Sequence, residues 1–302
     1  MAPREKDRLA VEMGRRIIDA AAAMGLKVTY VGSLGLPAPH PIFKPLTDRA
    51  EVISIAEPGH TDALEFDDGK LMLGKLAPLK DVTWENLVAR AGGVGRVAEL
   101  VGGSRLVAMV NWTMLPAMSD IWKRLLAEVY PNLPDARRGL FVDLADPAKR
   151  RSAELREAMR LLSGFQKFAD VTLGLNLSEA KQVGEVLKLR SRKDSEFEAM
   201  ARDIRARLGV GCVVVHPRHA AAAATPEGSA SFDGPFVVKP KASTGAGDHF
   251  NAGFSVGRVL GMDLAECLCI GVATSGYYVR HGVSPTTAEL VRFAARLPPP
   301  QR

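Results

Sequence analysis

Residues 241–250 read KASTGAGDHF, and this segment carries more structural information than any other in the chain. Its glycines stand among small residues, directly before a strongly apolar helical pattern. A helix that begins here directs its unsatisfied N–H groups, and the positive end of its dipole, at one point in space. The segment therefore predicts an anion hole for phosphoryl oxygens, formed by Gly245, Ala246 and Gly247.

Asp248 lies one turn into this predicted helix and can face the same point. A carboxylate there can accept the proton of an attacking hydroxyl group, while backbone amides stabilise charge on a transferring phosphoryl group. Asp248 is therefore the candidate catalytic base. Taken alone, a G-x-G segment is more often a turn in which an Asp supports a helix N-terminus, so the surrounding sequence has to separate the two interpretations.

The run T-G-A-G-D-x-F from Thr244 to Phe250 resembles the C-terminal signature of the ribokinase-like carbohydrate kinases, the phosphofructokinase B type family. The residues that follow agree with it, because a second helix is predicted from Asp263, with Glu266 completing a capping box, to near Gly282. The resemblance implies an α/β fold, a ribokinase-like three-layer sandwich with a mostly parallel central sheet and a small lid sheet. It also implies that a nucleotide lies beside these helices and contacts Thr244.

Asn176 and Glu179 form a second motif, N-x-x-E, where an apolar strand pattern ends and a helix begins. This motif resembles the N-x-x-E of the same family, which implies that both residues organise Mg²⁺ and its waters against the nucleotide phosphates. Without the signature, the pattern would indicate an Asn N-cap with a supporting Glu. Its position upstream of G-A-G-D, in the order of the family, favours the functional interpretation.

The resemblance extends more weakly to other strand ends. The segment VDLADP at 142–147 stands where the family has a strand ending in Asp-Pro, which implies that Asp143 or Asp146 lies near the site, with Asp143 as a substrate contact. His216 follows another strand and is expected in the nucleotide pocket, although these kinases usually have Thr-x-Gly there. Asn111 ends a strand near the sugar site of the family and is a candidate substrate contact. The segment at 142–147 could also be only a strand followed by a turn.

The sequence departs from the family pattern in two places. Ala242 stands where the family commonly has Asp. Residues 5–25 and 28–32 look like the first long helix and the next strand of the family, so the usual N-terminal strand and Gly-Gly segment are expected to be absent or replaced. Because that region defines the sugar pocket in the family, the identity of the sugar is left open.

His249 is expected to turn away from Asp248 and lie on the surface.

The rest of the chain alternates strand and helix patterns. Short apolar runs predict strands buried on both faces, at 106–110, 139–142, 171–175 and 210–215. Helical patterns between and after them predict crossovers at 119–129, 149–162, 177–188 and 194–208. Residues 1–302 are expected to form a single kinase domain. Its small lid sheet is expected at 51–75, with strands at 51–56 and 63–66 and a turn at 67–69.

Composition excludes several classes of protein. Apolar residues make up 47% of the 302 residues and charged residues 25%, close to the globular average, so a disordered or fibrous chain is excluded. Forty Lys and Arg against 34 Asp and Glu leave a net charge of +6, enough to favour an anionic substrate. The basic segment 188–207 has interleaved acidic residues, typical of a solvated helix, so no nucleic-acid partner is expected.

Three cysteines without a disulfide or zinc spacing favour a reducing, cytoplasmic location. No apolar run approaches the roughly 18 to 20 residues of a membrane span, so no membrane partner is expected. We expect a carbohydrate kinase that uses Mg²⁺ and ATP, with ADP as an alternative donor, and phosphorylates a sugar or a related small alcohol. The alternative is a non-catalytic, ribokinase-like regulatory protein that binds nucleotide or sugar. A homodimer is left open.

Overall fold

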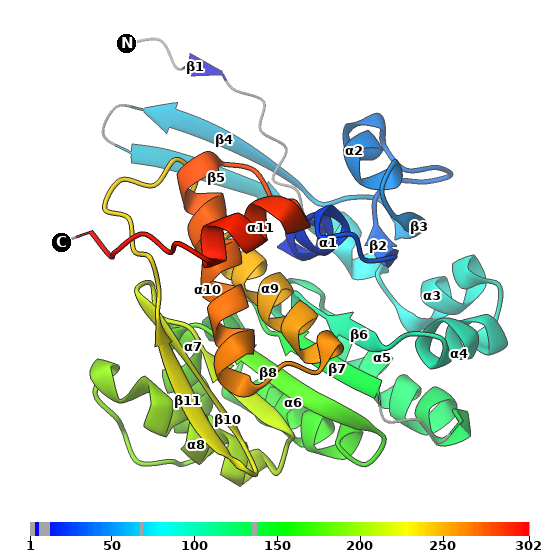
Figure 1. The fold of residues 1–302 in the computed structure, drawn as a ribbon. Coiled ribbons are helices and arrows are strands. Elements are labelled where there is room, and N and C mark those ends of the chain that lie inside the picture. The colour runs from blue at the N-terminus through cyan, green and yellow to red at the C-terminus, as the bar shows by residue number, and fades with distance from the viewer. Residues whose placement is uncertain (1–3, 6–12, 67–68, 135–137, 302) are drawn as a thin grey trace.

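A six-stranded sheet forms the centre of the computed structural model, which describes residues 4–5, 13–66, 69–134 and 138–301. Four neighbouring strands are parallel, and an antiparallel hairpin continues the sheet at one edge (Figure 1). In spatial order the strands are β6 (Leu106–Met109), β7 (Arg138–Asp143), β8 (Ala169–Leu175), β9 (Cys212–Val215), β10 (Ala220–Thr225) and β11 (Gly228–Asp233).

The apolar runs predicted as strands are buried on both faces of this sheet. Phe141 packs into the core beneath α9 and α10, whereas its neighbour Val142 packs into the core on the other face. Because both faces of each strand are buried, its residues form a continuous apolar run. The five alanines at 220–224, to which the sequence patterns assigned no element, form the buried strand β10.

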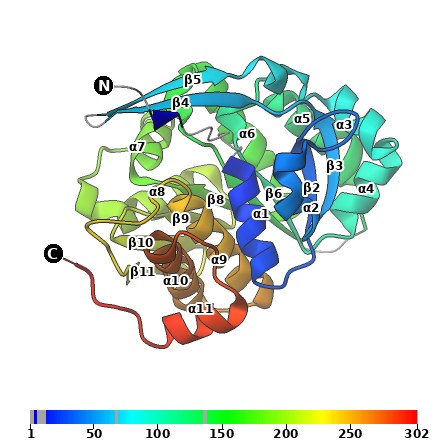
Figure 2. The same ribbon diagram turned by 90° about the horizontal axis from the view of Figure 1, so that it is seen from above.

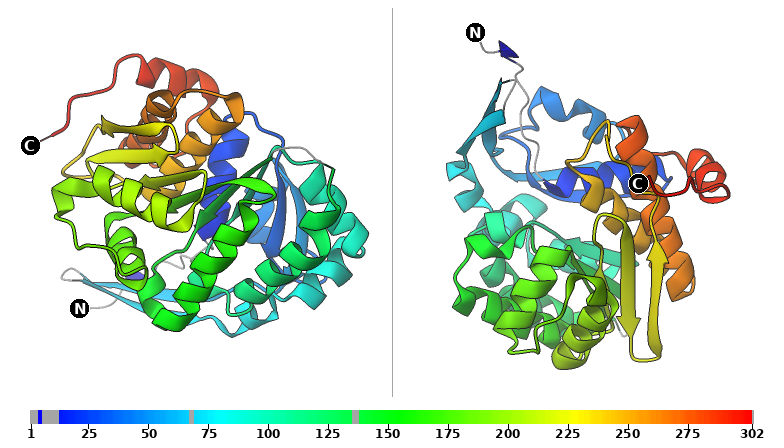
Figure 3. Two further views of the ribbon diagram at one scale, coloured as in Figure 1. Left: turned by 90° about the horizontal axis from the view of Figure 1, so that it is seen from below. Right: turned by 90° about the vertical axis from the view of Figure 1, so that its left-hand side faces the viewer.

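Helices cover both faces of the sheet, which makes the predicted three-layer sandwich (Figures 1 and 3). One layer contains α6 (Ser152–Phe165), α7 (Leu177–Val186) and α8 (Phe197–Leu208). The other layer contains α9 (Ala246–Leu260) and α10 (Leu264–His281), with α1 (Met13–Ala23) packed against α9 and α11 (Thr287–Ala294) against α10. The predicted capping box at Asp263 and the predicted helix end at Gly282 are both confirmed.

Four shorter helices of the described chain lie between β2 (Thr29–Ser33) and β7 in the sequence. They are α2 (Lys44–Thr47), α3 (Trp84–Ala91), α4 (Val94–Gly102) and α5 (Met118–Arg124), which continues into a π-helical turn at Leu125–Val129. Among the described residues, no helix has the length and apolar character needed to cross a bilayer.

The lid sheet differs from the prediction in its composition. It consists of β4 (His60–Phe66) and β5 (Gly69–Lys75), with β1 (Arg4–Glu5) paired to β4, and it lies along one side of the molecule in Figure 2. The predicted lid strand at 51–56 is instead β3 (Glu51–Ala56), which pairs in parallel with β2 (Thr29–Ser33). The prediction was wrong because a strand pattern does not show which strand it pairs with. The buried end of β3 belongs to the main core.

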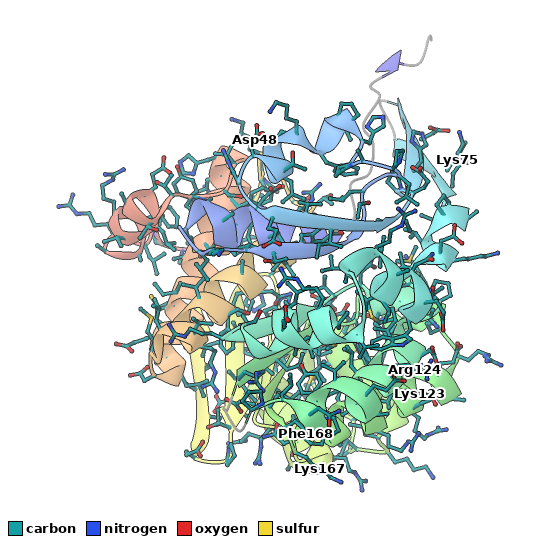
Figure 4. The ribbon with its side chains drawn as sticks, turned by 90° about the vertical axis from the view of Figure 1, so that its right-hand side faces the viewer. Asp48, Lys75, Lys123, Arg124, Lys167 and Phe168 are labelled. Carbon is teal, nitrogen blue, oxygen red and sulfur yellow. The ribbon has the colours of Figure 1, made fainter. Side chains whose placement is uncertain are left out.

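Two other predictions concern residues near this sheet. Glu5, predicted at the start of a helix, belongs to β1, and the predicted turn at Asp67 and Asp68 lies outside the described residues. Lys75 of the lid lies at the opposite end of the molecule from Lys167 and Phe168, which precede β8 (Figure 4). The lid is therefore far from the amino-terminal edge of the central sheet.

The parallel register brings the carboxyl ends of four strands to the same edge. Met109 lies opposite Val142 in the register of β6 and β7, and Leu175 lies opposite Val215 in that of β8 and β9. The residues that end or follow these strands therefore share one edge, where open α/β sheets bind ligands. They are Asn111, Asp143, Asn176 and His216.

Candidate functional site

The signature segment forms a turn that starts α9. Gly245 is the N-cap and has a left-handed backbone, with φ of 97°, which glycine adopts without strain. Within the described chain, the amides of Gly247 and Asp248 have no backbone hydrogen-bond partner, whereas Ala246 donates to the Ser243 carbonyl at 3.2 Å. The helix start therefore presents free donors, as predicted, but the amide of Ala246 is partly engaged.

Asp248 lies in the first turn of α9 with only 7% of its surface exposed. Burial raises the pKa of its carboxyl group to about 7; the positive charge of Arg16 opposes this rise, and the negative charge of Glu179 adds to it. A group that exchanges its proton near neutral pH suits general base catalysis. The geometry is therefore compatible with the role predicted for Asp248.

Two more buried carboxyl groups face Asp248 from the sheet edge. Burial and the charges of Glu179 and Asp248 hold the pKa of Asp143 well above its usual value. Asp143 accepts hydrogen bonds from the Ala145 amide at 2.9 Å and from Asn251 Nδ2 at 2.6 Å. Asn251, on α9, thus ties the signature helix to the end of β7, and the sequence patterns gave it no role.

Asn176 and Glu179 form a capping box at the start of α7. Asn176 Oδ1 accepts from the Glu179 amide at 3.0 Å, and Glu179 Oε2 accepts from the Asn176 amide at 2.8 Å. Glu179 Oε1 accepts from the amide of Asp146 at 2.8 Å. The side chain of Asp146 is exposed and lies 3.4 Å from Lys149, and its charge adds to the raised pKa of Glu179, whereas Asp143 is buried and interacts with both Glu179 and Asp248.

The donor set is suited to Mg²⁺ held through its waters. Three buried carboxyl groups lie here: the charges of Glu179 and Asp248 raise the pKa of Asp143, and the charge of Glu179 raises that of Asp248, so a divalent cation would relieve this repulsion. No three His, Cys, Asp or Glu side chains in the described ranges come together as a direct metal cluster. Asn251 Oδ1 is buried with no hydrogen-bond partner there and offers a further oxygen.

The predicted substrate contact Asn111 lies at the end of β6 in a buried loop. Its backbone is left-handed, with φ of 63°, and among the described residues its buried Oδ1 has no hydrogen-bond partner. Arg150 supports this loop by donating to the carbonyls of Trp112 at 2.9 Å and Leu115 at 2.7 Å. A sugar hydroxyl could satisfy the Asn111 oxygen. Arg150 was not identified from the sequence, because its three-dimensional partners are far away in the chain.

The two histidines near the signature behave differently from each other. His216 packs on Phe250 with ring centroids 4.7 Å apart, and burial lowers its pKa to about 4, so the ring is neutral. Its Nε2 has no partner among the described residues, and its Cε1 lies 3.4 Å from the position that a Cβ at Gly247 would take. The structure thus places His216 beside Gly247 at the start of α9.

His249, predicted to lie on the surface, is 2% exposed. It does point away from Asp248, but α10 and the loop after it cover that side of the helix. Its ring stacks on Tyr278 at 3.7 Å, Nε2 lies 2.9 Å from Ser284 Oγ, and Nδ1 lies 2.7 Å from the Gly245 carbonyl. The prediction was wrong because helix geometry gives a direction without showing what packs there.

Comparison with known proteins gives the family. The model of the prokaryotic ketohexokinase family matches residues 12–296. This chain belongs to that family. A ketohexokinase of Haloferax volcanii is 32% identical over 272 residues, which cover 90% of this chain and 71% of that protein.

Solved structures with lower sequence identity share the fold. The ribokinase of Arabidopsis thaliana, complexed with ribose and ATP, has a TM-score of 0.70 and 17% identity, covering 93% of this chain and 86% of that one. A carbohydrate kinase from Agrobacterium tumefaciens has a TM-score of 0.70 and 18% identity, covering 95% and 86%. The predicted ribokinase-like fold and the place of this ketohexokinase-family chain among the carbohydrate kinases are therefore confirmed.

Proposed function

We propose that this protein is an ATP-dependent ketohexokinase, which transfers a phosphoryl group from ATP to a hydroxyl group of a ketohexose such as D-fructose. The observation that carries the proposal is the buried carboxyl group of Asp248, placed beside free amides at the start of α9 and facing Asp143 and Glu179. The name of the Haloferax relative supports the sugar class, and the ATP named with the Arabidopsis ribokinase supports the donor.

Asp248 acts as the general base. Its pKa of about 7 leaves a substantial ionised fraction at neutral pH, and that fraction increases as the pH rises. The ionised carboxylate accepts the proton of the sugar hydroxyl as that oxygen bonds to phosphorus and the bond to the leaving ADP breaks. General base catalysis of this kind typically contributes ~10² to 10⁴ in rate.

The start of α9 binds the transferring phosphoryl group. The free amides of Gly247 and Asp248, the left-handed turn at Gly245 and the dipole of α9 all favour an anion at this point. Mg²⁺, when bound, neutralises charge on the phosphates. Glu179 and Asn176 would hold its waters, and Thr244 and the neutral ring of His216 would border the nucleotide.

The sugar lies toward β6 and β7. Asn111 Oδ1 is a buried acceptor with no hydrogen-bond partner among the described residues. Asp143 can accept further hydrogen bonds beyond the two it already accepts. Both groups can accept hydrogen bonds from sugar hydroxyls and orient the reacting hydroxyl toward Asp248. Such positioning supplies much of the rate of phosphoryl transfer.

A coupled assay with the purified protein tests the proposal. D-fructose is supplied with Mg²⁺ and either ATP or ADP, and D-glucose, an aldohexose, is the matched control. The expected result is turnover with fructose and ATP, with little turnover of glucose or with ADP. Turnover with ADP but not with ATP would show that ADP is the phosphoryl donor. Nucleotide binding without turnover of any sugar or small alcohol would favour a non-catalytic regulatory protein instead.

A further inference from the structure

Arg16 reaches the signature segment from the other end of the chain. It lies on α1, and its Nη1 donates to the carbonyl of Thr244 and to the hydroxyl of Tyr278, the latter at 2.7 Å. The Tyr278 hydroxyl donates to the same Thr244 carbonyl at 2.8 Å. Helices α1 and α9 pack side by side, so this contact joins the first described helix to the anion hole.

Gly245 leaves the space that Arg16 occupies. A Cβ at this position would lie 2.5 Å from both Cδ and Nη1 of Arg16, closer than such atoms approach in real structures. The guanidinium group therefore lies directly against the N-cap of α9. The free amides of Gly247 and Asp248 follow within the next turn, so the cation and the amides border one space.

The charge of Arg16 affects the proposed base, Asp248. Its positive charge opposes the rise in the pKa of the Asp248 carboxyl group. The other groups that bear on this carboxyl group from neighbouring elements, Glu179 on α7 and Asp143 on β7, are acidic. A cation here therefore offsets a concentration of negative charge that a nucleotide would increase.

The guanidinium group keeps donors free for a ligand. Both of its hydrogen bonds use Nη1, so within the described chain Nε and Nη2 have no hydrogen-bond partner. An arginine presents five N–H donors in a planar fork that matches two oxygens of a phosphoryl group. The hydrogen bonds to Thr244 and Tyr278 fix Nη1 and leave Nε and Nη2 available to a ligand.

We propose that Arg16 is a catalytic residue that binds the transferring phosphoryl group through Nε and Nη2 while Nη1 stays on Thr244 and Tyr278. The inference rests on the proposed function and adds a residue to it. The sugar oxygen forms the new bond to phosphorus, the bond to the ADP oxygen breaks, and the sugar proton goes to Asp248. Arg16 transfers no proton and stabilises the charge on the phosphoryl oxygens.

Four variants separate this role from a structural one. Arg16→Met removes the charge and the fork, and Arg16→Lys keeps the charge alone. Tyr278→Phe removes a donor to the Thr244 carbonyl, and an acceptor of Arg16 Nη1, without changing charge. Arg160→Met removes an exposed arginine of α6, whose closest acidic partner is Glu157 at 3.9 Å, and controls for net charge. Circular dichroism and thermal unfolding confirm that each variant is folded.

Calorimetric titration with ATP and with ADP, without sugar, is the first measurement, because only ATP carries the group to be transferred. We expect Arg16→Met to weaken ATP binding about tenfold and ADP binding less than about twofold, with kcat falling ~10² to 10³. Arg16→Lys should recover part of kcat. Arg160→Met should stay within about threefold of the unaltered protein, and Tyr278→Phe, which removes one of the two bonds that hold Nη1, should lose less than Arg16→Met.

The pH dependence of kcat/KM is the second measurement. Loss of Arg16 should move the acid limb to higher pH, because its charge no longer opposes the rise in the pKa of Asp248. Equal weakening of ATP and ADP binding in Arg16→Met, or an unchanged kcat in that folded variant, would overturn the proposal and leave Arg16 a structural residue. If the unaltered protein turned over no sugar, the proposed function would fail, while the nucleotide titrations would still decide the role of Arg16.

Discussion

Asp248 combines a proposed catalytic use with a cost in stability, and both come from burial. A carboxyl group in water has a pKa near 3.8, and at this position the value rises to about 7. The ionised form that accepts a proton is thus disfavoured relative to water, which makes it a stronger base. The charge of Arg16 opposes this rise in pKa and favours the ionised form.

Replacing Asp248 by Asn tests its chemical role. Asn is nearly the same size but cannot accept the proton, so we expect kcat to fall ~10² to 10⁴. Nucleotide affinity, measured by calorimetry, should change little because the amides remain. Full activity in a folded Asp248→Asn variant would rule out this residue as the base.

The same variant tests the cost in stability. Because the folded pKa of about 7 exceeds the ordinary 3.8, protonation stabilises the folded state, and this contribution is lost as the pH rises through 7. Asn is neutral throughout. Asp248→Asn should therefore raise the Tm more at about pH 8 than at about pH 4. Thermal unfolding at both values measures this, and an equal change at the two values would contradict it.

At the scale of elements, two helix starts build the site. The start of α9 depends on a left-handed glycine and free amides, and the start of α7 depends on a capping box that shares Glu179 with the Asp146 amide. Both starts lie beside the carboxyl ends of β7 and β8. Short local motifs could therefore indicate them, while their meeting depends on the parallel register.

The glycines of the signature should differ in their response to a side chain. A Cβ at Gly247 meets only His216 Cε1, at 3.4 Å, so Gly247→Val should stay folded while its side chain crowds the phosphoryl oxygens. We expect the rate to fall ~10² to 10³. Gly245→Val should in addition lower the Tm, because its backbone is left-handed and Arg16 occupies the space.

Calorimetry with ATP, enzyme kinetics and thermal unfolding compare the two glycine variants. Unchanged ATP affinity and rate in a folded Gly247→Val variant would mean that no phosphate visits the start of α9. That result would remove the main support for the proposed anion hole.

Glu179→Gln tests the second helix start. If Glu179 holds magnesium waters, the Mg²⁺ concentration for half-maximal rate should rise, because Gln keeps one oxygen acceptor and loses the charge. Glu266→Gln is a matched control, since Glu266 forms the corresponding capping box of α10 with Asp263 at 2.9 Å. Equal Mg²⁺ dependence in both variants would reduce Glu179 to a helix cap.

On the scale of the whole molecule, α1 connects the N-terminal region to the signature. Ile17 and Ala20 of α1 share a buried cluster with Ala252 of α9 and Ala273 of α10. Small side chains let these helices approach closely, which brings Arg16 to the turn at Gly245. The site therefore depends on packing between distant parts of the chain.

Overpacking this contact should affect both stability and catalysis. Ala20 is fully buried, so Ala20→Leu should cost about 1 to 3 kcal/mol of unfolding free energy and displace α1 from α9. Activity should fall because Arg16 moves with the helix. Ala22→Leu, at a half-buried position of the same helix, is the control. Denaturant unfolding and the kinase assay measure both effects, and equal losses in the two variants would contradict this role of α1.

Much of the fold and part of the site could be predicted from the sequence because their signals are local. Apolar runs predicted β7 and β8, and N-x-x-E predicted a helix start, where the structure shows the capping box that was the alternative to the magnesium role. T-G-A-G-D predicted a helix start with free amides and an acidic side chain in its first turn. Such patterns depend on backbone geometry within a few residues, which the amino-acid types largely determine.

Only the tertiary structure decided which distant residues complete the site. Arg16 and Thr244 are 228 positions apart, and Asp143 and Asn251 are 108 apart, so no spacing along the chain could indicate either pair. The pairing of β3 with β2 and the burial of His249 were likewise missed. The physical reason is that a residue pattern reports the shape and face of one element, whereas its partner is chosen by how all the elements bury their apolar surface together.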